Sequence, residues 1–403
     1  MRIWIVTNVD LGRAQGLRAS GIQNCQTAMA LADRGHSVCL WIAGDREEPR
    51  RFLAESLGRP LPPGLHLLPF ERSGERGDKK TPFATPAQRI WNAARAWRRV
   101  GFPDVVISRS PRVLSQLRAS RVLPSRTRLL LEYQHPEWAL LWRGWRASHP
   151  GRKLRSCVKR LGALRDREND WLRSADGVLY AARAHEALLE RAGFDGPTQP
   201  LASSCPPPGR GPAADESVYD LGYMGSLEPG YGLETLLEAM TKLDAATLRI
   251  AGAGPPAFVE ALERQIRERG LGDRVHRGPR VDPAQVRGLM QTCRLGVVPL
   301  SARHGPEKRK WASPLNLFEW MAAGVPVLAS RVASVAQHVE DGRDALLFAP
   351  DSAADLARAA AQLLADESLC AALSARGREL GEAHSYPERA RRIEEFCQGL
   401  VRG

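Results

Sequence analysis

Residues 313–319 bring together backbone and side-chain groups suited to binding an anion and a polyol side by side. Their order is Ser313, Pro314, Leu315, Asn316 and, three residues later, Glu319. We predict that Ser313 caps a helix whose first turn includes Pro314, because a serine hydroxyl accepts first-turn N–H groups and proline needs none there. The free amides of a helix start attract phosphates. Since the Glu319 carboxylate can accept hydrogen bonds from sugar hydroxyls, the segment predicts a nucleotide-sugar pocket.

The elements around this segment follow from its residue types. At helical spacing residues 315–322 are apolar nearly all round, which predicts a buried helix interrupted only by a stripe carrying Asn316 and Glu319. Gly324 fits the left-handed residue that ends a helix, and Pro326 prevents its continuation. Residues 327–329 then predict a short buried strand. A carboxylate inside such a helix needs polar partners, which a ligand would supply.

Alternating strands and helices run through both halves of the chain. In the first half we predict strands at 3–7, 37–43, 65–70, 104–108, 128–133 and 176–181, and helices at 22–34, 89–99 and 185–192. In the second half we predict strands at 219–224, 247–251, 275–277, 295–299, 327–329 and 345–348, and helices at 232–241, 256–269, 283–293, 352–366 and 386–401. This alternation is typical of parallel sheets covered by helices.

A proline- and glycine-rich stretch separates the halves. We therefore predict domains at 1–205 and 218–385, a linker at 206–217, and a last helical segment at 386–403 that packs back on the first domain. The length of 403 residues also favours two domains. Two doubly wound, Rossmann-like α/β domains facing each other across a cleft are the simplest assembly.

Composition restricts the partners and the compartment. The net charge of +13 favours an anionic partner, and nucleoside diphosphates, anionic lipids and nucleic acid all satisfy it. Hydrophobic residues make up 43% of the chain, yet no apolar run is long enough to span a bilayer, and the N-terminus has no signal-peptide pattern. We expect a cytoplasmic protein. The seven cysteines show no metal-ligand or redox spacing, so we expect them to be reduced and structural.

The second half resembles the retaining glycosyltransferases of family 4, which have the GT-B fold. Seven pieces occur in the family's order: residues 223–227, 232–239, 248–255, 275–281, 295–301, 313–330 and 339–347. The form Ser-Pro-x-x-Leu-Phe-Glu at 313–319 resembles one subset of that family. The first half resembles the family's acceptor-side domain more loosely, at residues 31–38, 103–109, 131–135 and 176–180.

The resemblance implies roles for individual residues of the second half. It places the ribose of the donor at Glu319 and the donor phosphates at the amides of Ser313, Pro314 and Leu315. It implies that Gly225 and Ser226 approach the diphosphate or sugar and that Arg280 lies at the nucleobase. Further donor-site candidates are Gly252, Gly254, Ser301 and Asn316, of which the two glycines either contact the nucleotide or only shape the backbone.

The chain departs from the family pattern in its charges. Asn316 and Trp311 stand where relatives often have a lysine and an acidic residue, and no cation occurs at 227–232. We expect Arg303 and Lys308 to supply the missing positive charge, because a leaving diphosphate needs cations or many N–H groups. No carboxylate cluster has metal-ligand spacing, so we expect no metal and no cofactor besides the donor substrate.

On the acceptor side, the resemblance implies that a loop with Gly16 and Gly21 closes over the substrates. His135 follows an apolar strand at the edge where α/β ligands bind, and we predict a hydrogen bond to the sugar or the reacting hydroxyl. Glu132 is either structural or acceptor-linked. Residues 142–173 are rich in Trp and Arg, and predict either a helix at an anionic membrane surface or a solvated face with its Trp packed inward.

The sequence therefore predicts a retaining glycosyltransferase that moves a sugar from a nucleoside diphosphate to a hydroxyl acceptor. We expect a growing bacterial polysaccharide or a lipid-linked acceptor, at the inner membrane face if the basic segment binds lipid. His135 and Glu319 are the catalytic candidates, and we expect no nucleic-acid partner. Three alternatives remain open: a nucleotide-sugar epimerase of the same fold, a degenerate member that only binds nucleotide, and a basic nucleic-acid-binding protein.

Overall fold

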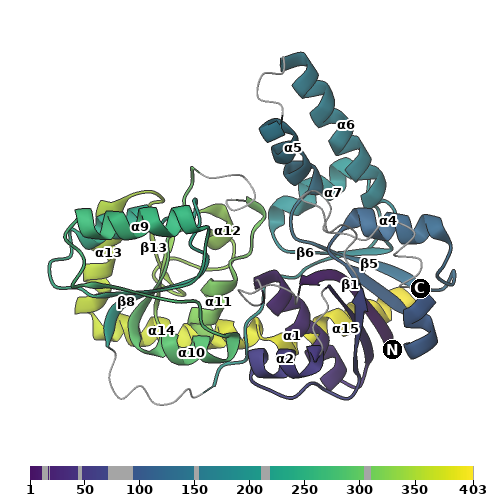
Figure 1. Ribbon diagram of the computed structural model, residues 1–403, viewed down its shortest axis with the longest axis horizontal. Helices are drawn as coiled ribbons and strands as arrows, with labels where there is room; N and C mark the ends of the chain where they lie inside the picture. The colour runs from purple at the N-terminus through teal and green to yellow at the C-terminus, as the bar shows by residue number, and fades with distance from the viewer. Residues whose placement is uncertain are drawn as a thin grey trace. The chain divides into compact units, whose positions relative to one another are not determined.

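The structure, a computed structural model, describes residues 1–10, 17, 19–43, 48–70, 94–148, 154–209, 218–303 and 310–402. The chain folds into two compact units (Figure 1). Unit 1 comprises Met1–Glu55, Arg59–Ala202 and Arg389–Gly403, and unit 2 comprises Ser56–Gly58 and Ser203–Glu388. Each unit contains one parallel sheet covered by helices, which confirms the predicted pair of Rossmann-like α/β domains.

Unit 1 is built on seven parallel strands in the order β3-β2-β1-β4-β5-β6-β7. The strands are β1 (Arg2–Asp10), β2 (Ser37–Ala43), β3 (Leu65–Phe70), β4 (Val105–Ser108), β5 (Arg128–Tyr133), β6 (Gly177–Tyr180) and β7 (Thr198–Pro200). The strand order reverses between β1 and β4, and ligands of doubly wound sheets bind at the carboxyl ends of such a pair. The sequence prediction missed β7, a short edge strand that ends in a proline, which only an edge position tolerates.

The helices of unit 1 cover both faces of its sheet. They include α1 (Ala19–Asp33), α2 (Pro49–Leu57), α4 (Pro111–Ser120), α5 (Glu137–Ser148), α6 (Leu154–Leu172), α7 (Glu186–Ala192) and the C-terminal α15 (Tyr386–Arg402), with a 3-10 turn η1 (Arg183–His185). Of the predicted helix at 89–99, only residues 94–99 lie within the described part, and they are helical. On one face, Trp4, Trp41 and Leu131 join residues of α4, α6 and α7 in a buried cluster.

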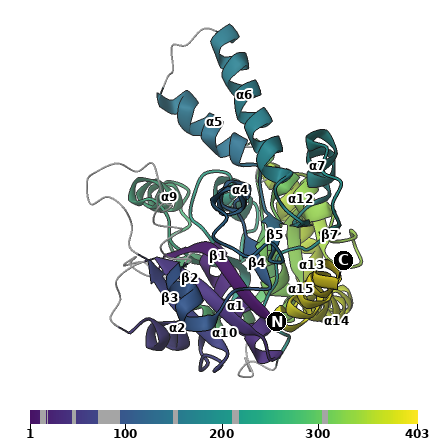
Figure 2. The same ribbon diagram turned by 90° about the vertical axis from the view of Figure 1, so that its right-hand side faces the viewer.

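The basic segment forms two helices. Helices α5 and α6 lie side by side and extend beyond the sheet of unit 1 (Figures 1 and 2). A Pro-Gly pair at 150–151 separates them in the sequence, and such a pair breaks a helix. One of the two interpretations of this segment named a single helix, and that part of it was wrong.

Unit 2 has six parallel strands in the order β10-β9-β8-β11-β12-β13. The strands are β8 (Tyr219–Met224), β9 (Leu248–Ala251), β10 (Val275–Gly278), β11 (Cys293–Val298), β12 (Val327–Ser330) and β13 (Leu346–Phe348). The helices are α8 (Leu233–Met240), α9 (Pro256–Glu268), α10 (Pro283–Gln291), α11 (Leu315–Ala322), α12 (Ala333–Ala336), α13 (Ala353–Ala365) and α14 (Glu367–Ala383). The strand order reverses between β8 and β11, which predicts the ligand site at their carboxyl ends.

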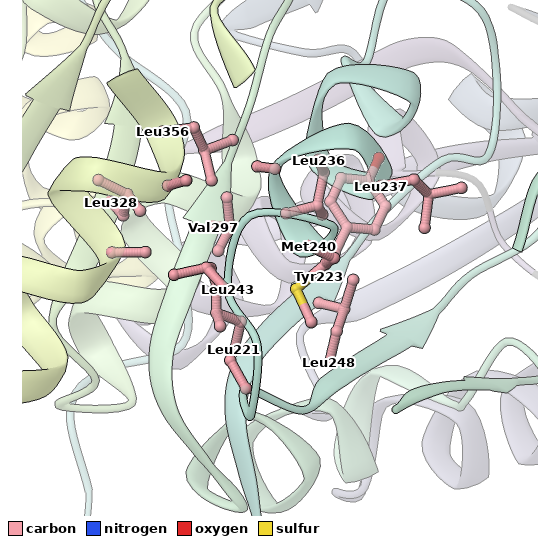
Figure 3. Close-up of a cluster of buried hydrophobic side chains, with 14 of the residues drawn as sticks. Leu221, Tyr223, Leu236, Leu237, Met240, Leu243, Leu248, Val297, Leu328 and Leu356 are labelled. Carbon is pink, nitrogen blue, oxygen red and sulfur yellow. The ribbon is translucent and has the colours of Figure 1, made fainter. Parts of the chain in front are cut away.

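The core of unit 2 holds β8 and β9 against α8. Leu221, Tyr223 and Leu248 of the sheet pack against Leu236 and Met240 of α8 in a continuous buried cluster (Figure 3). Helix α11 packs against α14 and against β11 and β12. Its side chains Leu317, Phe318, Trp320, Met321 and Ala322 are all buried, which confirms the predicted buried helix.

Candidate functional site

The start of α11 differs from the predicted cap. The cap position is Pro314, which offers no side-chain hydrogen bond. Ser313 is occupied elsewhere: its Oγ accepts the N–H of Ser203 at 2.9 Å, and its carbonyl accepts the Ser203 hydroxyl at 2.7 Å. The prediction of Ser313 as the cap was wrong because its hydroxyl binds a segment distant in the sequence.

This start leaves amides available to a ligand. The first N–H groups of an α-helix have no acceptor inside the helix. Among the residues that the structure describes, none is seen to accept the N–H of Leu315 or Asn316, whereas Leu317 N bonds to the Pro314 carbonyl at 3.3 Å. Helix geometry therefore presents donors and a positive dipole end beside the end of β8. Asn316 marks that proximity, since its Nδ2 donates to the Met224 carbonyl at 3.3 Å.

Glu319 lies one turn into the same helix. Its side chain is partly buried, and no hydrogen bond or ion pair joins its carboxylate to any described residue. Burial raises the pKa of Glu319 to about 7, and no nearby charge offsets this shift. Its charge adds to the burial that raises the pKa of the Cys205 thiol, so the two groups lie near each other. In the described part of the chain, the alternative of a structural salt bridge to an arginine has no support.

The helix ends as predicted. Gly324 has φ of 72°, in the left-handed region. The N–H of Val325 reaches back to the Trp320 carbonyl at 3.2 Å and so satisfies one of the last carbonyls of the helix. The chain then enters β12 directly, which places α11 against the sheet. Glu319 lies one turn after the start of α11.

Two glycine-containing loops meet backbone to backbone after β8 and β9. The N–H groups of Gly225 and Leu227 donate to the carbonyls of Ala251 and Ala253, at 3.1 and 3.0 Å. A Cβ at Gly252 would lie 1.9 Å from the Gly225 carbonyl oxygen, and one at Gly254 would lie 1.7 Å from that of Leu227. The packing of these loops therefore explains both glycines without a ligand. Of the two interpretations of the sequence, it favours the one in which they shape the backbone.

Hydrogen bonds hold the loop after β8, and residues 225–232 include no cation. The Tyr223 hydroxyl donates to the Ser226 carbonyl at 2.6 Å, and the Ser226 side chain bonds to Tyr231. Ser301, after β11, donates its N–H to the Gly230 carbonyl at 3.1 Å. These contacts bring together the loops that follow β8 and β11, the two strands where the sheet order reverses.

The structure describes two of the three basic residues predicted for the donor site, Arg280 and Arg303. Arg303 is 79% exposed and its Nε lies 3.8 Å from Asp351, so it forms a weak surface ion pair. Arg280 is partly buried and has interactions within the protein. Lys308 lies outside the described residues. Among the described residues of the site, the N–H groups of Leu315 and Asn316 are donors available to an anion.

In unit 1, Glu132 sits in a buried ion-pair cluster. Its Oε1 accepts from Arg109 Nε and Nη2 at 2.9 and 2.6 Å and lies 2.8 Å from Nη2 of the fully buried Arg389. Burial alone would raise the pKa of Glu132, but the two guanidinium groups outweigh it and lower the pKa to about 2. Arg389 also donates to Thr27 and to the Ala202 carbonyl, which attaches α15 to unit 1.

Sequence reasoning assigned no role to Arg109 and Arg389. The available signal was the position of Arg109 directly after β4, at the same sheet edge as Glu132. Nothing in the local pattern of α15 pointed to Arg389. The cluster supports the structural interpretation of Glu132.

His135 follows β5 and is exposed at the carboxyl edge of the unit 1 sheet. Its charge contributes to lowering the pKa of the neighbouring His185, which burial chiefly lowers to about 4. Gly21 lies in the first turn of α1 rather than in the loop where the sequence analysis placed it, because α1 begins at Ala19. Gly16 lies outside the described residues.

The described residues also form a cavity away from the start of α11. A cavity of about 330 Å³ is lined by Arg294, Pro326 and Cys370, at the amino ends of β11 and β12 and thus opposite the site above. No group of three or more His, Cys, Asp or Glu residues in the described ranges could hold a metal ion. None of the helices in those ranges combines the length and apolar character needed to cross a bilayer.

Comparison with known proteins defines the class. The structure resembles sucrose-phosphate synthase from Thermosynechococcus elongatus, with a TM-score of 0.74 and 19% identity over 99% of this chain and 98% of that chain. It resembles Anabaena HepE in complex with UDP, with a TM-score of 0.67 and 17% identity over 99% and 100%. It also resembles S. aureus TarM in complex with fondaparinux, alpha-GlcNAc-glycerol and UDP, with a TM-score of 0.70 and 11% identity over 100% and 99%. The chain therefore has the GT-B fold.

The sequence of unit 2 adds a family match. The family model described as glycosyl transferases group 1 matches residues 219–366, which contain β8 to β13 and the start of α11. No curated protein matches the chain in sequence. With the GT-B fold and a glycosyltransferase match over its second unit, the chain is a transferase enzyme.

Proposed function

We propose that the protein is a retaining glycosyltransferase of family 4 that moves a sugar from a nucleoside diphosphate to a hydroxyl acceptor. The observation that carries this proposal is the Glu319 carboxylate, which is buried enough to have a raised pKa and bonds to no described residue. Beside it, the amides of Leu315 and Asn316 supply donors for a diphosphate. A ribose at Glu319 would satisfy the carboxylate by two hydroxyl hydrogen bonds, while the diphosphate lies at the start of the same helix.

A thermal-shift titration with UDP, GDP, ADP and their sugars tests this binding. UDP compounds come first, because the HepE structures were determined with UDP and with UDP-glucose. We expect one nucleotide series to raise the melting temperature of the wild type and not of Glu319→Ala. Glu260→Ala, which removes an exposed carboxylate from α9, is the matched control and should respond like the wild type. An equal response of Glu319→Ala would refute the assignment of the site.

Turnover separates transfer from mere binding. In the proposed reaction the bond from the anomeric carbon to the donor phosphate oxygen breaks, and a bond to the acceptor oxygen forms on the same face. The acceptor proton passes to the leaving phosphate, so no protein base is required. Retention is checked by the anomeric coupling constant of the product. A clear thermal shift without turnover or donor hydrolysis would favour the degenerate nucleotide-binding alternative.

We also propose that the reaction needs no metal, and that the sugar donor is the only cofactor-like molecule. Activity should survive excess EDTA with no loss beyond twofold. On the acceptor side, we assign His135 a hydrogen bond to the transferred sugar or to the reacting hydroxyl, because it is exposed at the sheet edge where α/β proteins bind ligands. His135→Ala should lower kcat by about 10- to 100-fold, because one hydrogen bond to a group that gains charge in the transition state is worth about 1.5–3 kcal/mol.

The acceptor is proposed to be a polysaccharide or glycolipid precursor at an anionic membrane surface. Helix α6 exposes Lys159, Arg160 and Arg167, and the apolar Val158 of the same helix is 63% exposed. Basic and apolar side chains together favour anionic lipid. A variant with these three cations changed to Gln should float less with phosphatidylglycerol vesicles at low salt.

The matched control for flotation lies in unit 2. Arg264, Arg267 and Arg269 are also exposed, and their change to Gln removes the same charge from another surface. Flotation that falls equally in both triple variants would indicate only a net-charge effect. Unchanged flotation of the α6 variant would reject the membrane assignment.

A further inference from the structure

A single buried carboxylate of α6 holds the chain on both sides of His135. Glu168 is 1% exposed. Its Oε1 accepts the Tyr133 hydroxyl at 2.6 Å and the Glu137 N–H at 2.9 Å, and its Oε2 accepts the Trp138 N–H at 2.5 Å. Tyr133 precedes His135 by two residues, and the two amides follow it by two and three. The contacts therefore flank the histidine in the sequence.

The two amides are those that a helix start leaves without partners. Glu137 is the first residue of α5 and Trp138 the second, so neither N–H has an acceptor within the helix. Glu168 takes the place of a capping side chain, but it comes from a different helix. It thereby fixes where α5 begins, and so where the chain between β5 and α5 must run.

On the other flank, Tyr133 is held by burial and by a ring contact. Its ring is 1% exposed and meets the ring of His185 edge-on, with centroids 4.8 Å apart. On the opposite face of β5, the Gln134 Nε2 donates to Glu132 Oε1 at 2.8 Å. Of residues 133–138, His135 is the one that is exposed, while its neighbours are anchored to the interior of unit 1.

We infer that Glu168 is a positioning residue for His135: its carboxylate fixes the short segment between β5 and α5 and so presents the imidazole at the carboxyl edge of the sheet. Glu168 itself touches no substrate in this arrangement. The inference rests on the proposed function for the chemistry of His135, but the placement of the imidazole can be measured without any turnover. A displacement of about 1 Å in a reacting group can cost about 10²-fold in rate, so loss of this clamp should be visible in kcat.

The neighbouring strand provides a matched control. The Tyr180 hydroxyl of β6 donates to Glu186 Oε1 at 2.6 Å, the same kind of bond at the same length as that of Tyr133 to Glu168. Glu186 is exposed and bonds to neither flank of His135 among the contacts the structure describes. Glu168→Gln keeps the size of the side chain but turns an acceptor towards one of the three donors into a donor. Glu186→Gln makes the same chemical change without touching the clamp.

Two measurements decide the inference. In the transfer reaction we expect Glu168→Gln to lower kcat about 10- to 100-fold with the donor KM within twofold of wild type, and Glu186→Gln to leave both within twofold. In NMR spectra of histidine-labelled protein, with His135→Asn as the assignment variant, we expect the His135 imidazole signal to shift or broaden in Glu168→Gln and not in Glu186→Gln.

Each result supports or overturns the inference. If folded Glu168→Gln keeps both the wild-type kcat and the wild-type His135 signal, Glu168 does not position His135. The same conclusion follows if kcat and thermal stability fall together while the His135 signal is unchanged, since the role is then structural only. If Glu168→Gln does not fold, the comparison is repeated with Tyr133→Phe as the test variant and Tyr180→Phe as its control. The same two measurements, kcat and the His135 signal, then decide the inference. If the wild type transfers no sugar, the proposed function fails, and the His135 signal alone judges the clamp.

Discussion

Replacing Glu319 by glutamine should make the ligand-free protein more stable above neutral pH and its nucleotide binding weaker. The pKa of this carboxyl is raised from 4.5 to about 7 by burial, so the folded state binds a proton more tightly than the unfolded state. Stability from this group is therefore fully present below pH 4.5 and is lost as pH rises through 7. A shift of this size corresponds to about 3 kcal/mol. Because the side chain keeps some exposure, water screening makes this an upper limit.

The assay is urea unfolding of the wild type and Glu319→Gln at pH 5 and pH 8.5, without ligand. Between these pH values the wild type should lose about 2–3 kcal/mol relative to the variant, or roughly 5–10 °C in the melting temperature of a domain of this size. Burial raises the pKa of Glu168 in unit 1 to about 7 as well, so only the difference between the two proteins is diagnostic. Glu260→Gln, on the surface of α9, should show no such difference.

The same variant should bind the nucleotide about 10- to 100-fold more weakly, because a hydrogen bond to a charged group contributes more than one to a neutral amide. Higher stability with lower affinity is the expected signature of a residue kept for function. If Glu319→Gln shows the same pH dependence of unfolding as the wild type, folding does not raise the pKa of Glu319, and the carboxylate is not a buried group without a partner.

Three further perturbations test the surrounding framework. Glu132→Leu should cost about 3–5 kcal/mol by calorimetry, because it leaves the buried Arg389 without a counter-charge, and the double variant with Arg389→Met should recover part of that loss; full additivity would contradict the pairing. Gly254→Ala should lower the melting temperature of unit 2, whereas Gly272→Ala, which has no neighbouring atom within 4 Å of an added Cβ, should not; equal melting would contradict the loop packing. Asn316→Lys should tighten nucleoside diphosphate binding several-fold at low salt and little at high salt, and an unchanged affinity at low salt would place the phosphates elsewhere.

Local sequence patterns were sufficient where the determining contacts are local. The apolar periodicity of 315–322 and the glycine after it specified a buried helix and its end, and Gly324 adopts the left-handed conformation that this required. The strand rhythm likewise specified two parallel sheets, because parallel strands buried on both faces read as apolar runs. These features depend on residues a few positions apart, which a periodicity can detect.

The errors occur where a partner lies far away in the sequence. The hydroxyl of Ser313 looks like a cap until Ser203, 110 residues earlier, is brought against it. Arg389 and Glu132 are more than 250 residues apart in the sequence, and only the return of α15 to unit 1 joins them. No local pattern specifies either pairing. The sequence could thus name Glu132 but not decide between an acceptor-linked and a structural role.

Glu132 and Glu319 differ in what offsets their burial. Both lie near the carboxyl ends of a parallel sheet, and burial acts on each in the same direction. At Glu132 two guanidinium groups more than offset that burial and leave the pKa at about 2. At Glu319 no described residue offsets it, and the pKa stays at about 7. A group left in this condition destabilises the free protein, and a ligand with hydroxyl donors removes the penalty on binding. Glu132 is therefore paired within unit 1, whereas no described residue pairs with Glu319, which is the condition that the proposed function requires.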